Sequence, residues 1–122
     1  MKIEELEEKI IAWGCERGII GPDGANDPFK QMEKTLEEVG ELQYALDSWP
    51  HKISEFDETE IEVAATIRRD MIRDAIGDII VTLIMQAQIH GMSLQECIES
   101  AWAEIKDRKG KMVDGMFVKE YL

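Results

Sequence analysis

The chain has 122 residues and carries 26 Asp and Glu side chains against 14 Lys and Arg, a net charge of −12. That length predicts one domain over residues 1–122, and a content of 44% hydrophobic and 33% charged residues is typical of a folded, soluble protein. The acidic excess argues against a protein that binds nucleic-acid polymers through a basic surface, and it disfavours docking on an anionic membrane.

The sequence has no pattern typical of secretion or of a membrane span. Residues 1–5 are acidic and amphipathic, unlike a signal peptide. The longest apolar run, at 79–85, is far shorter than the roughly 20 residues that a membrane-spanning helix needs. We therefore expect a cytoplasmic protein that has no membrane partner.

The N-terminal segment predicts a helix over about residues 2–17, because apolar side chains recur there at helical spacing. These side chains are Ile3, Leu6, Ile10 and Trp13. Residues 18–28 are rich in Gly, Pro and Asn, a composition that predicts a loop.

The second predicted helix extends from Pro28 to about Trp49. Asp27 can cap its N-terminus, Pro is favoured at the first helical position, and Pro50 ends the helix. Apolar positions at helical spacing predict the face that packs into the core, with Glu38 at the edge of that face. These positions are Met32, Leu36, Val39 and Leu46.

The third predicted helix is the longest. It follows an acidic link in which Ser54 or Asp57 can act as the cap, and it runs to about His90, before Gly91. Residues 79–85 read Ile-Ile-Val-Thr-Leu-Ile-Met, which indicates burial on every side. A chain this small can hardly surround one helix, so we expect a helical bundle in which another copy covers part of it, as a homodimer or homotetramer.

The C-terminal part predicts a fourth helix and a short β-hairpin. Ser93 followed by Glu96 is a capping pattern, and the helix should run to about Lys109. The Asp-Gly pair at 114–115 lies between apolar residues, which predicts a hairpin or an extended tail. The expected fold class is therefore all-α, a four-helix bundle-like domain with a C-terminal hairpin.

Three glutamates cluster on the second predicted helix. Glu38 and Glu41 lie about 60° apart around the helix axis, and Glu37 lies within about 40° of Glu41. Lys34, one turn before Glu38, is the nearest compensating charge. On composition alone, a solvated acidic face explains this cluster.

Two aspartates on the third predicted helix favour a metal site instead. Asp74 and Asp78 are one turn apart, and Asp78 enters the apolar segment, where an ionised carboxylate is costly unless a cation pairs with it. Arg69 and Arg73 should project from other faces of this helix, and the three glutamates of the second helix supply no cation. A divalent metal between the two helices resolves the conflict, and all-oxygen ligation points to Mg²⁺, with Mn²⁺ as a substitute.

A basic segment lies late in the fourth predicted helix and just beyond it. It contains Lys106, Arg108, Lys109 and Lys111. These cations can bind the terminal phosphates of a nucleotide, or they can simply interact favourably with the helix dipole at the C-terminus.

Together these motifs resemble the MazG-like branch of the all-α NTP pyrophosphohydrolases. The resemblance covers most of the chain, and its segments are Trp13, Arg17-Gly18-Ile19, Gln31, Lys34, Glu37-Glu38-Val39-Gly40-Glu41-Leu42, Asp74-Ala75-Ile76-Gly77-Asp78 and 104–110. The tail at 113–120 looks like that of the small phage-type members. The resemblance implies Mg²⁺-dependent hydrolysis of a nucleoside or deoxynucleoside triphosphate to the monophosphate and pyrophosphate, in nucleotide-pool control or sanitation.

The resemblance also implies roles for individual residues. The metal ligands would include Glu38, Glu41 and Asp78, and Glu37 would complete the metal shell or orient the attacking water, so that Glu37, Glu38 and Glu41 form the catalytic set. Many family members have Glu where this chain has Ala75, and Asp74 is the available substitute as a metal ligand.

The expected substrate contacts are Trp13, Gln31, Lys34, Lys106, Arg108 and Lys109. Trp13 is an aromatic candidate for the base, and Gln31 and Lys34 share a helix side with the carboxylates. Two alternatives stay open at this point: a catalytically decayed acidic helical oligomer that acts as an interaction module, and a dUTPase-like phosphohydrolase on the same bundle.

Overall fold

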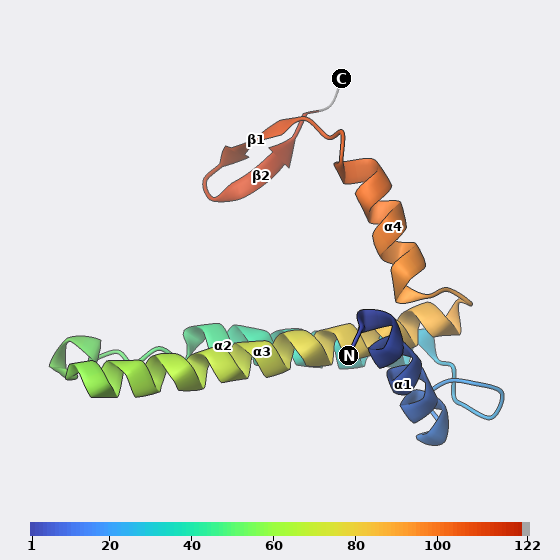
Figure 1. Ribbon diagram of the computed structural model, residues 1–122, viewed down its shortest axis with the longest axis horizontal. Coiled ribbons are helices and arrows are strands. Elements are labelled where there is room, and N and C mark those ends of the chain that lie inside the picture. The colour runs from blue at the N-terminus through green and yellow to red at the C-terminus, as the bar shows by residue number, and fades with distance from the viewer. Residues whose placement is uncertain (121–122) are drawn as a thin grey trace.

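The computed structural model describes residues 1–120, which form four α-helices and a two-stranded β-sheet (Figure 1). The helices are α1 (Ile3–Glu16), α2 (Pro28–Asp47), α3 (Glu58–Ile89) and α4 (Leu94–Ile105), and a 3₁₀ turn, η1 (Ile53–Glu55), lies between α2 and α3. Strands β1 (Gly110–Val113) and β2 (Met116–Lys119) pair antiparallel. The predicted helical class and the C-terminal hairpin are confirmed.

The helix starts follow the predicted capping residues. Asp27 Oδ1 accepts hydrogen bonds from the backbone N–H groups of Phe29 and Lys30, at 3.0 and 3.1 Å. Asp57, of the two candidates, caps α3, and with Glu60 it forms a complete capping box. Each carboxylate satisfies N–H groups that have no partner inside the helix, which sets where the helix begins.

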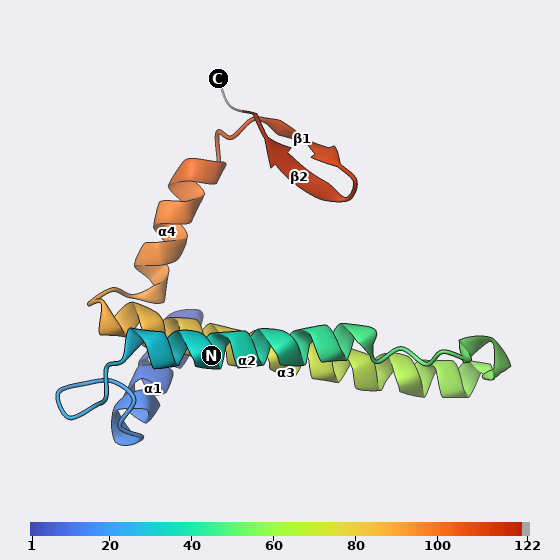
Figure 2. The same cartoon turned by 180° about the vertical axis from the view of Figure 1, so that it is seen from behind.

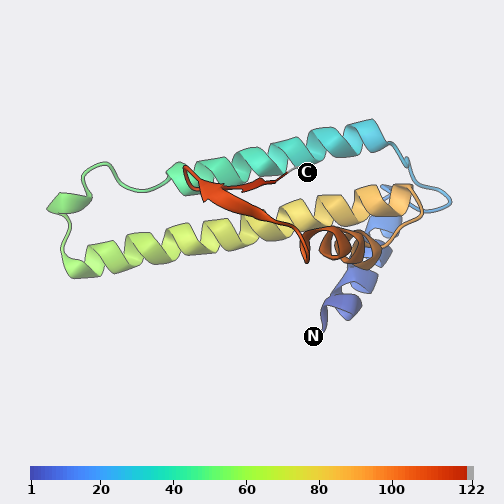
Figure 3. The same ribbon diagram turned by 90° about the horizontal axis from the view of Figure 1, so that it is seen from above.

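The helices α2 and α3 lie antiparallel and side by side, as Figures 2 and 3 show from two directions. Polar side chains are buried between them. The hydroxyl of Thr35 donates to Thr82 Oγ1 at 2.9 Å, and the hydroxyl of Thr82 donates to the carbonyl of Ile79 at 2.7 Å. The side-chain amide of Gln31 reaches the carbonyl of Thr82 at 3.4 Å. Buried polar groups are therefore hydrogen-bonded across this helix pair.

The prediction of which α2 residues pack into the core is wrong for a single chain. The residues that α2 buries are Gln31, Thr35 and Ala45. The expected core positions are between 43% and 58% exposed; they are Met32, Leu36, Val39 and Leu46. Small and short polar side chains let α2 approach α3 closely, and the larger apolar side chains are left on a neighbouring face.

The apolar core lies where α1 and the loop after it meet the C-terminal half of α3. Ile20, Ile84 and Met85 are its buried members. Gly14 on α1 is buried against Met85, and a Cβ at this position would overlap the Met85 sulfur. A larger residue at 14 would therefore require the end of the Met85 side chain to move.

The segment from α4 to the hairpin, residues 94–119, extends away from the other helices (Figure 1), and we call it the C-terminal arm. α4 is bent by 98° from α3, and Gly91 supplies the required positive φ of 71°. The carboxylate of Glu7 on α1 accepts a hydrogen bond from Leu94 N at 2.7 Å, which ties the base of the arm to α1. The helix ends at Ile105 rather than near Lys109. The hairpin turn carries positive φ at Asp114 and Gly115.

Within residues 1–120, no single helix is long and apolar enough to cross a membrane; α3 and α4 reach that length and hydropathy only as a bent pair.

Candidate functional site

A groove of about 380 Å³ between α2 and α3 is lined by most of the carboxylates that the sequence singles out, and we call it the acidic groove. Its lining residues are Glu38, Glu41, Met71, Asp74, Ala75 and Asp78. The structure thus brings together the four side chains expected to bind a metal, two from each helix. Ala75, which is 4% exposed, also lines this groove, and its small side chain leaves room there.

Helix periodicity explains why these carboxylates share one groove. Glu38 and Glu41 are three residues apart on α2, and Asp74 and Asp78 are four apart on α3, so each pair lies on one side of its helix. The antiparallel packing of the two helices then places one pair opposite the other. The site is therefore a product of the α2–α3 pair alone.

Glu37 does not line the acidic groove. Its side chain is 62% exposed, and its carboxylate pairs with Lys34 Nζ at 3.1 Å. Glu38, whose side chain is only 14% exposed, receives the same ammonium group at 3.5 Å. The hydrogen bond and charge of Glu37, with those of Glu38, raise the pKa of Lys34 above its ordinary value. Lys34 therefore forms ion pairs with both the solvent-exposed Glu37 and the groove-lining Glu38.

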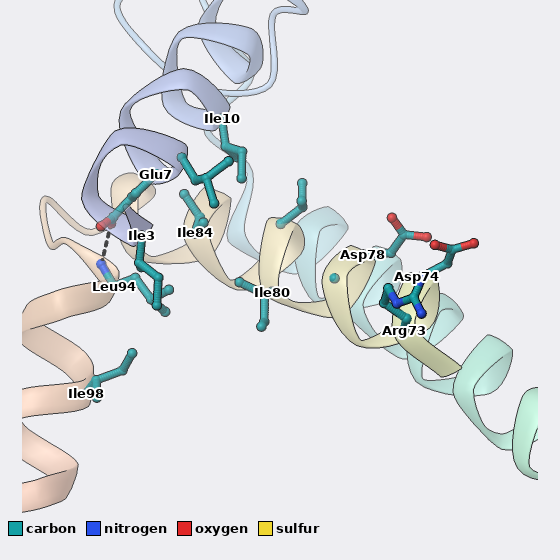
Figure 4. Close-up of a pocket in the computed structure, with 13 residues that line it drawn as sticks. Ile3, Glu7, Ile10, Arg73, Asp74, Asp78, Ile80, Ile84, Leu94 and Ile98 are labelled. Carbon is teal, nitrogen blue, oxygen red and sulfur yellow. Dashed lines mark hydrogen bonds between the residues drawn. The ribbon is translucent and has the colours of Figure 1, made fainter. Parts of the chain in front are cut away.

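Asp78 and Asp74 are exposed in the single chain, so burial within one chain does not force a cation onto Asp78. The residues around Asp78 on α3 are not enclosed by this chain; Ile76, Ile80 and Leu83 are between 40% and 47% exposed. Arg73 also differs from expectation, since it lines a neighbouring groove together with Asp74 and Asp78 (Figure 4). Its guanidinium pairs with Asp70 at 3.2 Å.

The acidic groove has the donor chemistry for a hard divalent cation, but its side chains are not drawn together as a closed metal cluster. In the part of the chain that the structure describes, no group of three His, Cys, Asp or Glu side chains is close enough to hold a metal ion. Over the same residues, Glu41, Asp74 and Asp78 form no ion pair. Carboxylates without cation partners are suited to Mg²⁺, which prefers oxygen ligands and keeps several of its waters.

A second pocket, of about 410 Å³, adjoins the acidic groove, and we call it the Trp13 pocket. It is lined by Trp13, Ile19, Gln31, Lys34, Glu38, Asp78, Val81, Thr82 and Met85. Glu38 and Asp78 line both spaces. Three of the expected substrate contacts, Trp13, Gln31 and Lys34, therefore lie beside the carboxylates.

The other three expected substrate contacts are not near the groove within one chain. Lys106, Arg108 and Lys109 follow the last turn of α4 in the C-terminal arm, which points away from α2 and α3 (Figure 1). Arg108 instead lies 3.6 Å from Glu104.

Sequence reasoning missed several lining residues, among them Thr82 and Met71. Thr82 carried a usable signal, because it continues the four-residue spacing of Asp74 and Asp78 and is the one polar residue in the run at 79–85. Met71 carried no such signal, because in the sequence it cannot be told apart from an apolar residue of the core.

Comparisons of this chain with protein-family models, curated proteins and solved structures found no match.

Proposed function

We propose that this chain is a Mg²⁺-dependent nucleoside triphosphate pyrophosphohydrolase, with Mn²⁺ as a possible substitute. The observation that carries the proposal is the junction of the acidic groove with the Trp13 pocket, at Glu38 and Asp78. The resemblance to MazG-like proteins supports it, and the proposed fold is the all-α bundle of that group, acting in the cytoplasm.

The two spaces suit the two ends of a nucleotide. The Trp13 pocket offers apolar and aromatic surface with the amide of Gln31, which suits a base. The acidic groove would repel a bare triphosphate, so binding there needs cations. Mg²⁺ held by Glu38, Glu41, Asp74 and Asp78 would neutralise the phosphates and lower the pKa of a bound water.

The chain's own residues divide the remaining work. Water adds to the α-phosphorus and the α–β anhydride bond breaks, releasing the monophosphate and pyrophosphate. Lys34, which lines the Trp13 pocket, pairs with the carboxylate of Glu38 and would place a positive charge on the pocket side of the boundary. Glu37 lines neither space and pairs with the same lysine, and the role proposed for it is to accept the proton of the attacking water.

The test is a panel of nucleoside and deoxynucleoside triphosphates, each incubated with the purified full chain and Mg²⁺ or Mn²⁺. We expect the monophosphate and pyrophosphate in equal amounts, read by anion-exchange chromatography without added pyrophosphatase. Orthophosphate as the first inorganic product would overturn the proposal. A single active substrate, dUTP, would instead identify the dUTPase-like alternative.

A non-enzymatic interaction module is the second candidate, favoured by the separation of the carboxylates in this structure. It predicts no turnover of any triphosphate and no effect of Mg²⁺ on thermal stability. The Asp78→Asn variant, purified in parallel, distinguishes true turnover from a contaminating phosphatase, since a contaminant would be unaffected by the substitution.

A further inference from the structure

This chain exposes much more surface than a compact protein of its size. Its accessible surface is 9624 Å². A compact monomer of 14.0 kDa exposes about 6,700 Å². The excess is about 2,900 Å² per chain, and obligate homodimers bury about 2,000–5,000 Å² or more in total. The excess is thus large enough for a stable interface with a second copy.

Part of that surface is an apolar groove of about 680 Å³ between α1, α3 and α4 (Figure 4). Isoleucines dominate one part of it: Ile3, Ile10, Ile80, Ile84 and Ile98. Asp74 and Asp78 lie at its other end, where the apolar groove joins the acidic groove. Along α3 the lining therefore changes from apolar to acidic.

The C-terminal arm also exposes apolar side chains, because within residues 1–120 only its base at Leu94 packs against the core. No residue of α4 or of the hairpin is buried. Trp102 is 60% exposed, and Ile105 and Phe117 are about half exposed. A two-stranded hairpin without a packing partner is at best marginally stable in water, so its apolar side chains need a surface to cover them.

The distribution of charge along the chain indicates which surface could cover the arm. Residues 106–122 carry five basic and three acidic side chains, a net charge of +2. Residues 1–105 carry nine basic and 23 acidic side chains, a net charge of −14. The arm also runs from apolar (Ile98, Trp102, Ile105) to basic (Lys106, Arg108, Lys109), the same order in which the apolar groove runs to its acidic end.

We propose that a second copy of this chain covers the apolar groove with its C-terminal arm. Trp102 of the partner subunit packs among the isoleucines, and the basic segment after it reaches the acidic end of the groove, where Arg108 of the partner subunit lies beside Asp74 and leaves Asp78 open to a metal ion. A symmetric exchange of arms covers both grooves at once and needs no further protein. The proposal stands whether or not the chain hydrolyses triphosphates, because it rests on surface, packing and charge.

Sedimentation equilibrium of the full chain over a range of concentrations tests the association. We expect a mass of at least two chains, and we expect Trp102→Glu and Ile80→Glu each to weaken association at least about tenfold. Tyr44→Glu is the matched control, since Tyr44 on α2 is 67% exposed and lies outside the groove. Circular dichroism checks that each variant keeps its helices. A monomeric wild-type chain would overturn the proposal and leave the groove to a different partner.

A cross-link tests where the arm lies. In a background with Cys15→Ser and Cys97→Ser, an Asp74→Cys chain is mixed with a differently tagged Arg108→Cys chain and oxidised. We expect a disulfide between the two tags, and no such product when Lys52→Cys replaces Arg108→Cys. A stable dimer that forms without the Asp74–Arg108 cross-link would show that the arm does not occupy this groove. This readout is independent of activity, so it separates failure of the arm proposal from failure of the proposed function.

Discussion

Glu38 on α2 and Asp78 on α3 each line both the acidic groove and the Trp13 pocket, so these two carboxylates mark the boundary between the two spaces. For a nucleotide whose base lies in the pocket, this boundary is where the first phosphates would lie. Chemistry on the α-phosphorus needs charged groups at that point, and the other acidic side chains of the groove are farther from the pocket.

Removing charge at this boundary should abolish turnover without unfolding the chain. We expect Glu38→Gln and Asp78→Asn each to lower kcat/KM by about 100-fold or more, measured as pyrophosphate release. Glu33→Gln on the same helix is the control, because Glu33 is exposed and pairs with Lys30 away from the groove. Activity in Asp78→Asn equal to that of the control would contradict the assignment.

Magnesium should stabilise the folded chain through the acidic groove. At ten times its Kd, a ligand that binds only the folded state adds about 1.4 kcal/mol, which raises the Tm of a domain this size by about 5 °C. The rise should disappear in a variant that combines Asp74→Asn with Asp78→Asn and persist in Glu62→Gln, which is exposed and outside the groove. Calorimetry at one protein concentration measures it, and an equal rise in all three proteins would mean non-specific binding.

Ala75 determines how many carboxylates the groove can hold. Ala75→Glu places a fifth carboxylate at a position that is 4% exposed, so we expect a loss of about 1–3 kcal/mol in the free energy of unfolding without metal. If the groove binds Mg²⁺, the ion should restore much of that loss. Gln has nearly the volume of Glu but no charge. Ala75→Gln should therefore also be less stable than the wild type, but Mg²⁺ should stabilise it no more than it stabilises the wild type. Urea titrations with and without Mg²⁺ compare the two variants.

The hydrogen bond between Thr35 and Thr82 should couple the two residues energetically. Thr82→Val removes this acceptor while the hydroxyl of Thr35 keeps the carbonyl of Gln31 at 3.0 Å, so we expect a cost of about 0.5–1.5 kcal/mol, that of one hydrogen bond. The Thr35→Val and Thr82→Val double variant should lose less than the sum of the two single variants. Thr66→Val, at an exposed position of α3, should change stability by about 0.5 kcal/mol or less. Strict additivity in urea unfolding would argue against the coupling.

The Glu7 carboxylate should stabilise the base of the C-terminal arm. Glu7→Ala removes the acceptor for Leu94 N and should cost about 1–2 kcal/mol, with faster amide exchange at Leu94. Glu7→Gln keeps a side-chain oxygen and should recover part of both effects. Glu8→Ala, at the next and exposed position of α1, is the control. Unchanged exchange at Leu94 in Glu7→Ala would mean that the cap does not hold the arm.

Local signals in the sequence were enough to predict the helices. Asp27 and Asp57 mark the starts of α2 and α3 because their carboxylates bind backbone N–H groups that have no partner inside the helix, a local interaction that the sequence alone reveals. The end of α4 was predicted less well. Its last turn has no neighbour to pack against, and helical propensity alone rarely sustains such a turn, so the helix ends at Ile105.

The carboxylates of the site were predictable from spacing, but their surroundings were not. Helical periodicity alone puts Glu38 with Glu41 and Asp74 with Asp78. The exposure of Asp78 depends on which other elements cover α3, and one chain leaves that side open. The same reason explains the exposed apolar stripe of α2, since a hydrophobic pattern predicts that a face is covered but not by which chain.

The hydrogen bond between the hydroxyls of Thr35 and Thr82 fixes the register of α2 relative to α3. Two apolar helices can slide past one another by a fraction of a turn at little cost, because dispersion contacts have no direction. A 2.9 Å hydrogen bond with both groups buried does not tolerate such a slip. Since α2 and α3 each contribute two carboxylates to the acidic groove, this contact, together with the hydrogen bond from Gln31 to the carbonyl of Thr82, fixes how those pairs are aligned along the helix axes.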